Sequence, residues 1–350
     1  MNALLEKTSL RLGYLPLLDC APLIVAAEKG FFERRGLHVE LVAHGSWASV
    51  RDRLATGGID GAHLLAPIVL ASRMNLDGLR TPLVTALSLN RNGNTVTVSN
   101  ALYEAVFALA PDASDAASVG AALAQVVRAR EARGKTRLCF AYVHPHSSHH
   151  LLLRQWLEQA GLDPDRDVRF FVIPPPQMEV HLQAGNIDGF CVGAPWGALA
   201  THHGHGKLLV TSAQIWPAHP EKVLGVTEEW AQAHPHSHVQ MLAALIEAAR
   251  WIETAQNRTE LVQLLLRATP MQAPAELLQS IFAQRPASGG PQFYEAFATW
   301  PDTSHAETLA RRLRLALKLA EDESAIALAA AGYRPEIYRQ AALLAGVAAP

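Results

Sequence analysis

Cysteine is scarce in this chain of 350 residues, which has only Cys20, Cys139 and Cys191 and no CxxC pair. A set this small and odd in number argues against a disulfide framework and predicts reduced thiols in a cytosolic protein. We expect each thiol to behave as a small buried hydrophobe.

Long apolar runs and a secretory leader are missing as well. The chain begins MNALLEKTSLRLGYLPL, where Glu6 and Lys7 interrupt the early apolar stretch, so no signal peptide is predicted. No window holds about 18 uncharged apolar residues, as a membrane span would need. These patterns predict a cytoplasmic protein that does not enter a membrane.

Charge is low and balanced, with 30 Lys and Arg against 32 Asp and Glu and a net charge of −2. This balance does not fit a protein that binds nucleic acid through a broad basic face. Hydrophobic residues make up 49% of the chain, so a large core is available. The length exceeds one usual core, and two domains are expected.

Motifs of several enzyme classes are also missing. The sequence has no phosphate-binding loop, no G-x-G-x-x-G and no G-x-S-x-G nucleophile elbow, so no cofactor and no catalytic residue is predicted. Two histidine-rich stretches raise the question of a metal, namely His202 to His205 and the run His144, His146, His149 and His150. No carboxylate or cysteine stands at the usual ligand spacing from them, and no metal site is predicted.

What the sequence does contain is a regular alternation of short apolar strands and amphipathic helices. Strands are predicted over 10–15, 37–43 and 61–65, with helices over 21–29, 48–55 and 67–74 between and after them. A second set follows, with strands over 137–142, 168–173 and 189–192 and helices over 116–133, 149–160 and 176–184. From about 220 onward the pattern is almost purely helical, including one long helix over 303–330. This rhythm predicts an α/β protein with parallel sheets.

An internal repeat divides the chain. Leu54-Ala-Thr-Gly-Gly-Ile-Asp-Gly61 matches Leu182-Gln-Ala-Gly-Asn-Ile-Asp-Gly189, and each copy lies where a predicted helix ends and a strand begins. Gly57 and Gly185 suit the left-handed position that stops a helix. Two copies predict two similar lobes.

The predicted architecture is therefore a bilobal ligand clamp of two doubly wound α/β lobes with a helical C-terminal extension. Lobe 1 is expected over 8–98 plus 206–350 and lobe 2 over 99–205, with the strand-rich segment 82–99 crossing between them. Ligands of such folds bind beside strand ends and helix N-termini, and the lobes close on them.

Several segments over residues 10–230 together resemble the nitrate-binding protein family, the NrtA/NasS/CmpA branch of the type II periplasmic-binding-protein folds. The most specific are PPPQM (174–178) and IDGFCVGAPW (187–196), supported by GSW (45–47) and IDGAH (59–63). In that family a Trp, a Gln, a His, a Gly and a Lys hold the oxyanion. Carried across by motif, the resemblance implies a nitrate site at Trp47, Asn94, His149, Gly193 and Lys222.

Two positions depart from the family pattern. Asn94 is a shorter amide than the family's Gln, and Ala194 stands where transporter-type relatives have Glu before Pro-Trp. The shorter Asn94 leaves the choice between nitrate and nitrite open.

The implied residues suit a planar anion that only accepts hydrogen bonds. Trp47 and Asn94 offer N–H donors, Lys222 a cation, and His149 lies at a predicted helix start, where first-turn N–H groups favour anions. Gly193 lets a ligand approach backbone closely. A cationic Lys222 favours nitrate or nitrite, whereas bicarbonate, whose OH donates, would gain from an acidic acceptor.

Within this family, the missing signal peptide favours a sensor that resembles NasS over a transporter subunit. This resemblance implies a cytosolic nitrate and nitrite sensor that sequesters an ANTAR-type (NasT-like) RNA-binding antiterminator without ligand, releases it on anion binding and so controls nitrate assimilation genes. The alternatives are a solute-binding component of an ABC transporter for nitrate or another small anion, including sulfonates, and an enzyme on the same fold.

Overall fold

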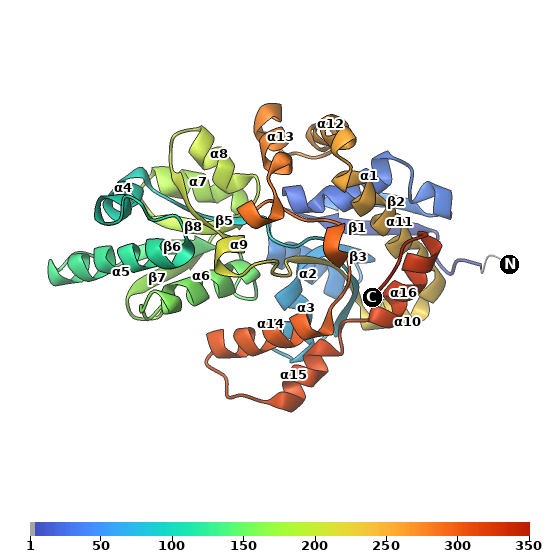
Figure 1. Cartoon of the computed structure of the whole chain (residues 1–350). Coiled ribbons are helices and arrows are strands. Elements are labelled where there is room, and N and C mark those ends of the chain that lie inside the picture. Colours follow the sequence, from blue (N-terminus) through green and yellow to red (C-terminus); the bar gives the residue numbers. More distant parts are fainter. Residues whose placement is uncertain (1–3) are drawn as a thin grey trace. The chain divides into compact units, whose positions relative to one another are not determined.

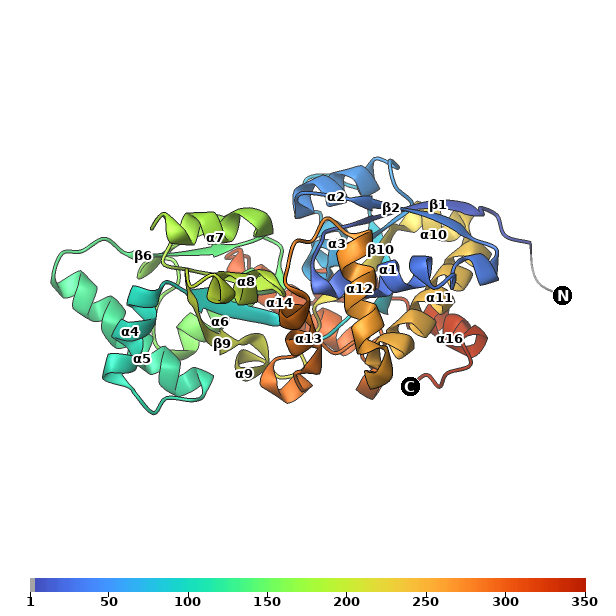
Figure 2. The same ribbon diagram turned by 90° about the horizontal axis from the view of Figure 1, so that it is seen from above.

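A computed structural model describes residues 4–350 and divides the chain into two α/β units (Figure 1). The first unit holds the chain up to Arg91, together with Pro220–Phe282 and Gln292–Pro350. The second holds Asn92–His219 and Ala283–Pro291. The two segments of the second unit are thus inserted into the first, and each unit contains one five-stranded sheet covered by helices (Figure 2).

The two sheets have the same topology. The first runs in the order β2-β1-β3-β10-β4 and the second in the order β7-β6-β8-β5-β9. In each, the first three strands of this order pair in parallel, and the fourth, β10 or β5, is antiparallel to the strands on both of its sides. The first sheet comprises β1 (Ser9–Tyr14), β2 (His38–Ala43), β3 (Gly61–Leu65), β4 (Leu83–Ser88) and β10 (Lys222–Thr227). The second comprises β5 (Asn94–Val98), β6 (Leu138–Tyr142), β7 (Val168–Val172), β8 (Gly189–Gly193) and β9 (Lys207–Thr211).

The unit boundaries differ from those expected at 98/99 and 205/206. Strand β5 pairs with β8 and β9, so residues 94–98 and 207–211 belong to the second unit's sheet rather than to the first. The segment 82–99 does carry two strands, but β4 and β5 lie in different sheets. Hydrogen bonding, which a composition shift does not reveal, sets these boundaries.

Helices pack on both sheets. In the first unit they are α1 (Ala21–Glu28), α2 (Trp47–Ala55), α3 (Ala66–Arg73), α10 (Glu228–Ala233), α11 (Pro235–Glu253), α12 (Arg258–Ala268), α14 (Thr303–Ala316), α15 (Glu323–Ala330) and α16 (Pro335–Leu344). In the second they are α4 (Asn100–Leu109), α5 (Ala116–Ala132), α6 (Ser148–Gln159), α7 (Pro175–Gln183), α8 (Trp196–His202) and α9 (Ser212–Ile215); α13 (Ala275–Ala283) ends at the unit boundary. The C-terminal helices cover the first unit: α11 packs on α1 and α16, and α14 on α3 and α15. None of the helices among residues 4–350 combines the length and the apolar character needed to cross a membrane.

Two features of the C-terminal half were predicted wrongly. Residues 222–227 form strand β10 inside the first sheet, although the region from 220 was expected to be almost purely helical. The helix expected over 303–330 is two helices, α14 and α15, and Lys318 between them has a φ of +57°. A right-handed helix cannot continue through that left-handed backbone.

The sequence repeat proves to be one structural device used twice. After α2, Gly57 has a φ of +72°, its N–H bonds to Leu54 and the next N–H bonds to Arg53. After α7, Gly185 has the same φ of +72°, with the same pair of bonds to Leu182 and His181. Both are Schellman caps.

The aspartate of each repeat then fastens the central strand to its parallel neighbour. The Asp60 carboxylate accepts the Arg11 N–H of β1 at 2.9 Å, and the Asp188 carboxylate accepts the Cys139 N–H of β6 at 2.8 Å. The Asp60 N–H donates to the Arg11 carbonyl, and that of Asp188 to the Cys139 carbonyl, so each aspartate makes a reciprocal pair. These bonds set the register in which β3 and β8 enter their sheets.

We expect Gly185→Ala to lower the free energy of unfolding by about 1–2 kcal/mol, because the added Cβ is strained at a left-handed φ. Gly45→Ala is the matched control. Both glycines have open space where a Cβ would stand, but Gly45 has no left-handed φ, so the control should be neutral or slightly stabilised. Urea denaturation followed by circular dichroism measures both. Equal effects in the two variants would contradict the cap.

Candidate functional site

The predicted site residues lie at the carboxyl ends of the parallel strands in their own sheets. In the first unit, α2 begins at Trp47 after β2, and Lys222, the first residue of β10, pairs with Leu65 at the end of β3. In the second, Asn94, the first residue of β5, pairs with Gly193 at the end of β8. This is the edge at which open α/β sheets bind ligands.

A buried ion cluster surrounds Lys222. Its ammonium lies 2.8 Å from the Asp19 carboxylate and 2.5 Å from that of Glu221, and all three side chains are buried. Burial disfavours the charged lysine, but the attraction of Asp19 and Glu221 outweighs it, so the pKa of Lys222 is raised. A lysine this deep in a protein keeps its charge only with such partners.

His63 on β3 completes this cluster through Asp19. Its Nε2 lies 2.9 Å from the Asp19 carboxylate, while its Nδ1 accepts the Leu15 N–H at 3.4 Å. Burial lowers the pKa of His63 against the pull of Asp19, which favours the neutral ring. Burial alone would raise the pKa of Asp19, but Lys222 and His63 outweigh it and hold that pKa well below its ordinary value.

The charge of this cluster differs from the expectation. Lys222 was expected to bring net positive charge to an anion. The structure surrounds it with two carboxylates and a neutral His63, so the cluster carries one more negative than positive charge. Asp19 and Glu221 were missed because the family motif assigns a ligand role to Lys222 alone, and Asp19 lies more than two hundred residues away in the chain. The nearest signal was Glu221 beside Lys222 in HPEK.

Trp47 packs against the same cluster. The Lys222 ammonium lies 5.4 Å from the centre of the Trp47 ring, and the His63 ring lies 5.1 Å away. Ser46 caps the helix by accepting the Ser49 N–H, which fixes Trp47 in the first turn of α2. Its indole Nε1 is buried and has no hydrogen-bond partner among residues 4–350. Such a donor costs about 1–3 kcal/mol unless a ligand or water accepts from it.

Asn94 and Gly193 are neighbours in the second sheet. The Asn94 N–H donates to the Ser212 hydroxyl at 3.2 Å, which anchors the backbone at the start of β5. The Asn94 side chain is fully buried, and neither its amide nitrogen nor its amide oxygen has a partner in the described part of the chain. An amide in this state is suited to a polar ligand.

His149 lies in the first turn of α6, the helix that follows β6. Ser147 caps this helix by accepting the His150 N–H, and the His149 side chain is fully buried. The N-terminal end of a helix presents unpaired N–H groups that favour an anion. His150, in contrast, has a structural role. It stacks on Tyr142 at 4.3 Å, and burial lowers its pKa to about 4.

The structure therefore brings the five predicted residues together in two groups. Trp47 and Lys222 share one cluster in the first unit. In the second unit, Asn94 faces Gly193, and His149 follows β6, the parallel neighbour of β8. Each group offers buried N–H donors at a sheet edge.

Comparison with known proteins assigns the class. A model of the NMT1-like family matches residues 3–266, and the chain belongs to this family. The crystal structure of the periplasmic nitrate-binding protein NrtA from Synechocystis PCC 6803 superposes with a TM-score of 0.86 and 28% identity, over 98% of this chain and 90% of that one. The predicted α/β fold of the periplasmic-binding-protein type and the predicted NrtA-like family are confirmed.

Two curated relatives share more of the sequence. The chain is 42% identical over 265 residues to the bicarbonate transport ATP-binding protein CmpC of Synechocystis sp. and 41% identical over 265 residues to the nitrate import ATP-binding protein NrtC of the same organism. Each match covers 75% of this chain, which spans 38% of CmpC and 37% of NrtC.

We expect Lys222→Met to destabilise the fold by about 3–5 kcal/mol at pH 7, because it leaves two buried carboxylates without a counter-ion. In the wild type, Asp19 has a lowered pKa, so its stabilising effect is present above its ordinary pKa and lost only in stronger acid. In the variant, burial without the lysine raises the carboxylate pKa values, so stability falls as pH rises. Denaturation from pH 5 to 8 measures this slope. Lys135→Met at an exposed position is the control and should match the wild type; a flat profile for Lys222→Met would contradict the assignment.

Proposed function

We propose that the chain binds a small planar oxyanion, nitrate or nitrite, through Trp47, Asn94, His149, Gly193 and Lys222. The observation that carries the proposal is the pair of buried side chains without partners, the Trp47 indole and the Asn94 amide. Both lie at ligand-binding edges of their sheets. The likeness to NrtA over nearly the whole chain supports the same ligand class. No catalytic step is part of the proposal.

Bicarbonate is the second candidate, and one observation favours it. Asp19 and Glu221 place acidic acceptors beside Lys222, and bicarbonate, unlike nitrate, has an OH that could donate to one of them. The likeness to CmpC, named for bicarbonate transport, points the same way. A comparison of the two anions on one protein sample is therefore the decisive measurement.

We expect calorimetry of the dialysed protein to show saturable binding of nitrate or nitrite, with no heat from chloride and a weaker response to bicarbonate. Trp47→Phe, which keeps an aromatic side chain but removes the indole N–H, should weaken nitrate binding about tenfold to a hundredfold, the contribution of a hydrogen bond to a charged group. Asn94→Ala should act in the same direction.

Trp251→Phe is the control for Trp47, because Trp251 also has a lysine over its ring, at 5.2 Å, but lies on α11. It should bind nitrate like the wild type. If bicarbonate binds more tightly than nitrate, the ligand of the site is bicarbonate, the second candidate. If none of the anions produces heat, both proposed ligands are wrong.

We further propose that the chain is a cytosolic sensor that holds an ANTAR-type antiterminator without ligand and releases it when the anion binds. The resemblance to NasS-type sensors supports this form. The transport names of NrtC and CmpC support the alternative, a solute-binding component of an ABC transporter, equally well.

The two forms differ in their partner. For a sensor, size-exclusion chromatography should show a complex with the ANTAR-type antiterminator of the host organism without nitrate and two separate peaks with it. Thermodynamic linkage requires a reciprocal effect: the antiterminator should lower the affinity for nitrate by the same factor by which nitrate lowers the affinity for the antiterminator. Nitrate binding without this complex, together with co-purification of a membrane permease, would establish the transport form and leave the anion site intact.

A further inference from the structure

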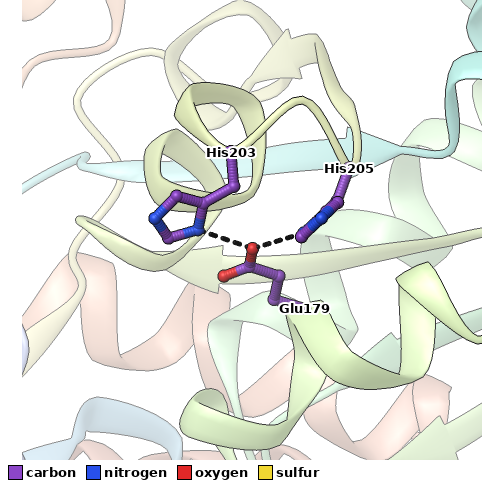
Figure 3. Close-up of side chains that lie close together, drawn as sticks. All are labelled: Glu179, His203 and His205. Atoms are coloured by element: carbon purple, nitrogen blue, oxygen red, sulfur yellow. Dashed lines mark hydrogen bonds and ion pairs between the residues drawn. The ribbon is translucent and has the colours of Figure 1, made fainter.

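Glu179, His203 and His205 form a cluster on the second unit (Figure 3). Lys207, two residues beyond His205, pairs with Val98 at the end of β5, whereas Asn94 begins that strand. His203 follows the last turn of α8, whose first residue comes soon after Gly193. The cluster is therefore at the opposite end of β5 and of α8 from the proposed anion ligands.

The three side chains converge on one point. The Nδ1 atoms of His203 and His205 each lie 2.7 Å from the same oxygen of Glu179 (Figure 3). The three potential ligand atoms all lie within 4.8 Å of one another, and among residues 4–350 no other group of three His, Cys, Asp or Glu side chains meets this condition. In the sequence, no carboxylate stands at the usual ligand spacing from these histidines. Glu179 on α7 supplies one from more than twenty residues earlier, because α7 packs on α8.

A helix stop of the kind described above fixes the backbone around the histidines. Gly204 has a φ of +75°, its N–H bonds to Thr201 and the His205 N–H bonds to Ala200 at 2.9 Å. The Gly204 carbonyl also accepts the Asn100 side chain at 2.8 Å. The glycine between the two histidines thus turns the chain so that both rings face Glu179. Rigid backbone beneath the ligands is what a binding site requires.

We propose that Glu179, His203 and His205 form a site for one divalent transition-metal ion of the zinc class. Imidazole nitrogens and a carboxylate oxygen are ligands that zinc prefers, and three protein ligands leave a fourth position for water. Tetrahedral ligand atoms around zinc are roughly 3.3 Å apart, so the nitrogens move outward by about half an ångström when an ion enters. The side chains have room for this movement, since those of His203 and His205 are 46% and 32% exposed.

The ion would join α7 to the turn between α8 and β9. Metal bound only by the folded protein raises stability by mass action. A plain histidine–carboxylate hydrogen-bond pair, with no affinity for metal, is the competing explanation, and it predicts the same contacts. The two explanations differ in what added zinc does.

The test uses the full chain, stripped with a chelator and dialysed. Equilibrium dialysis should find one Zn²⁺ per chain at this site, thermal unfolding should shift upward with Zn²⁺, and Co²⁺ should give the visible absorption of a tetrahedral site. Three single variants should each lower the affinity for Zn²⁺ at least tenfold and remove the thermal shift: Glu179→Gln, His203→Ala and His205→Ala. Circular dichroism without metal verifies that the variants are folded.

His202→Ala is the control, because His202 is exposed and its ring lies 5.6 Å from that of His203, but it is outside the cluster. It should bind Zn²⁺ like the wild type. Absence of Zn²⁺ binding would leave only the histidine–carboxylate pair and overturn the proposal. Equal Zn²⁺ binding by the wild type and the three cluster variants would place the ion elsewhere and overturn it as well.

Discussion

The antiparallel fourth strand of each sheet is the constraint on which the rest of the structure depends. Strand β10 lies between β3 and β4, and strand β5 between β8 and β9. Because an antiparallel strand begins where its parallel neighbours end, its first residue shares an edge with their carboxyl-terminal loops. Lys222 and Asn94 are these first residues. The fold thus places one polar side chain at the ligand-binding edge of each sheet.

Strand β10 also explains why the first unit is built from segments that are not contiguous in the sequence. This strand lies between β3 and β4, but it comes from a segment that follows Asn92–His219, the larger segment of the second unit. The first sheet is therefore complete only after the chain returns. A βαβ rhythm describes the local units but does not include this long-range pairing.

The environment of Lys222 shows how burial changes the chemistry of a motif residue. A lone buried lysine loses its charge or destabilises the fold, so its charged state here depends on Asp19 and Glu221. Those carboxylates change what the site offers a ligand, because the cationic Lys222 becomes part of a network with an excess of one negative charge. The choice between a pure acceptor and an anion with a proton to donate rests on this network rather than on Lys222 alone.

The local sequence pattern alone determined the bounds of several helices and strands and the position of two helix caps. Strand β3 has the predicted bounds, the helix that carries Trp47 and the one that carries His149 lie within a residue of their predicted ranges, and the repeat marked both Schellman caps. These features depend on apolar spacing and on glycine at a left-handed φ, which neighbouring residues set. Only the tertiary structure decided that 222–227 is a strand, that β5 belongs to the second sheet, that Asp19 and His63 join Lys222, and that Glu179 meets His203 and His205. Each of these depends on partners far away in the chain, and the physical reason is that strand pairing and buried charge pairing are interactions between segments, which no local periodicity encodes.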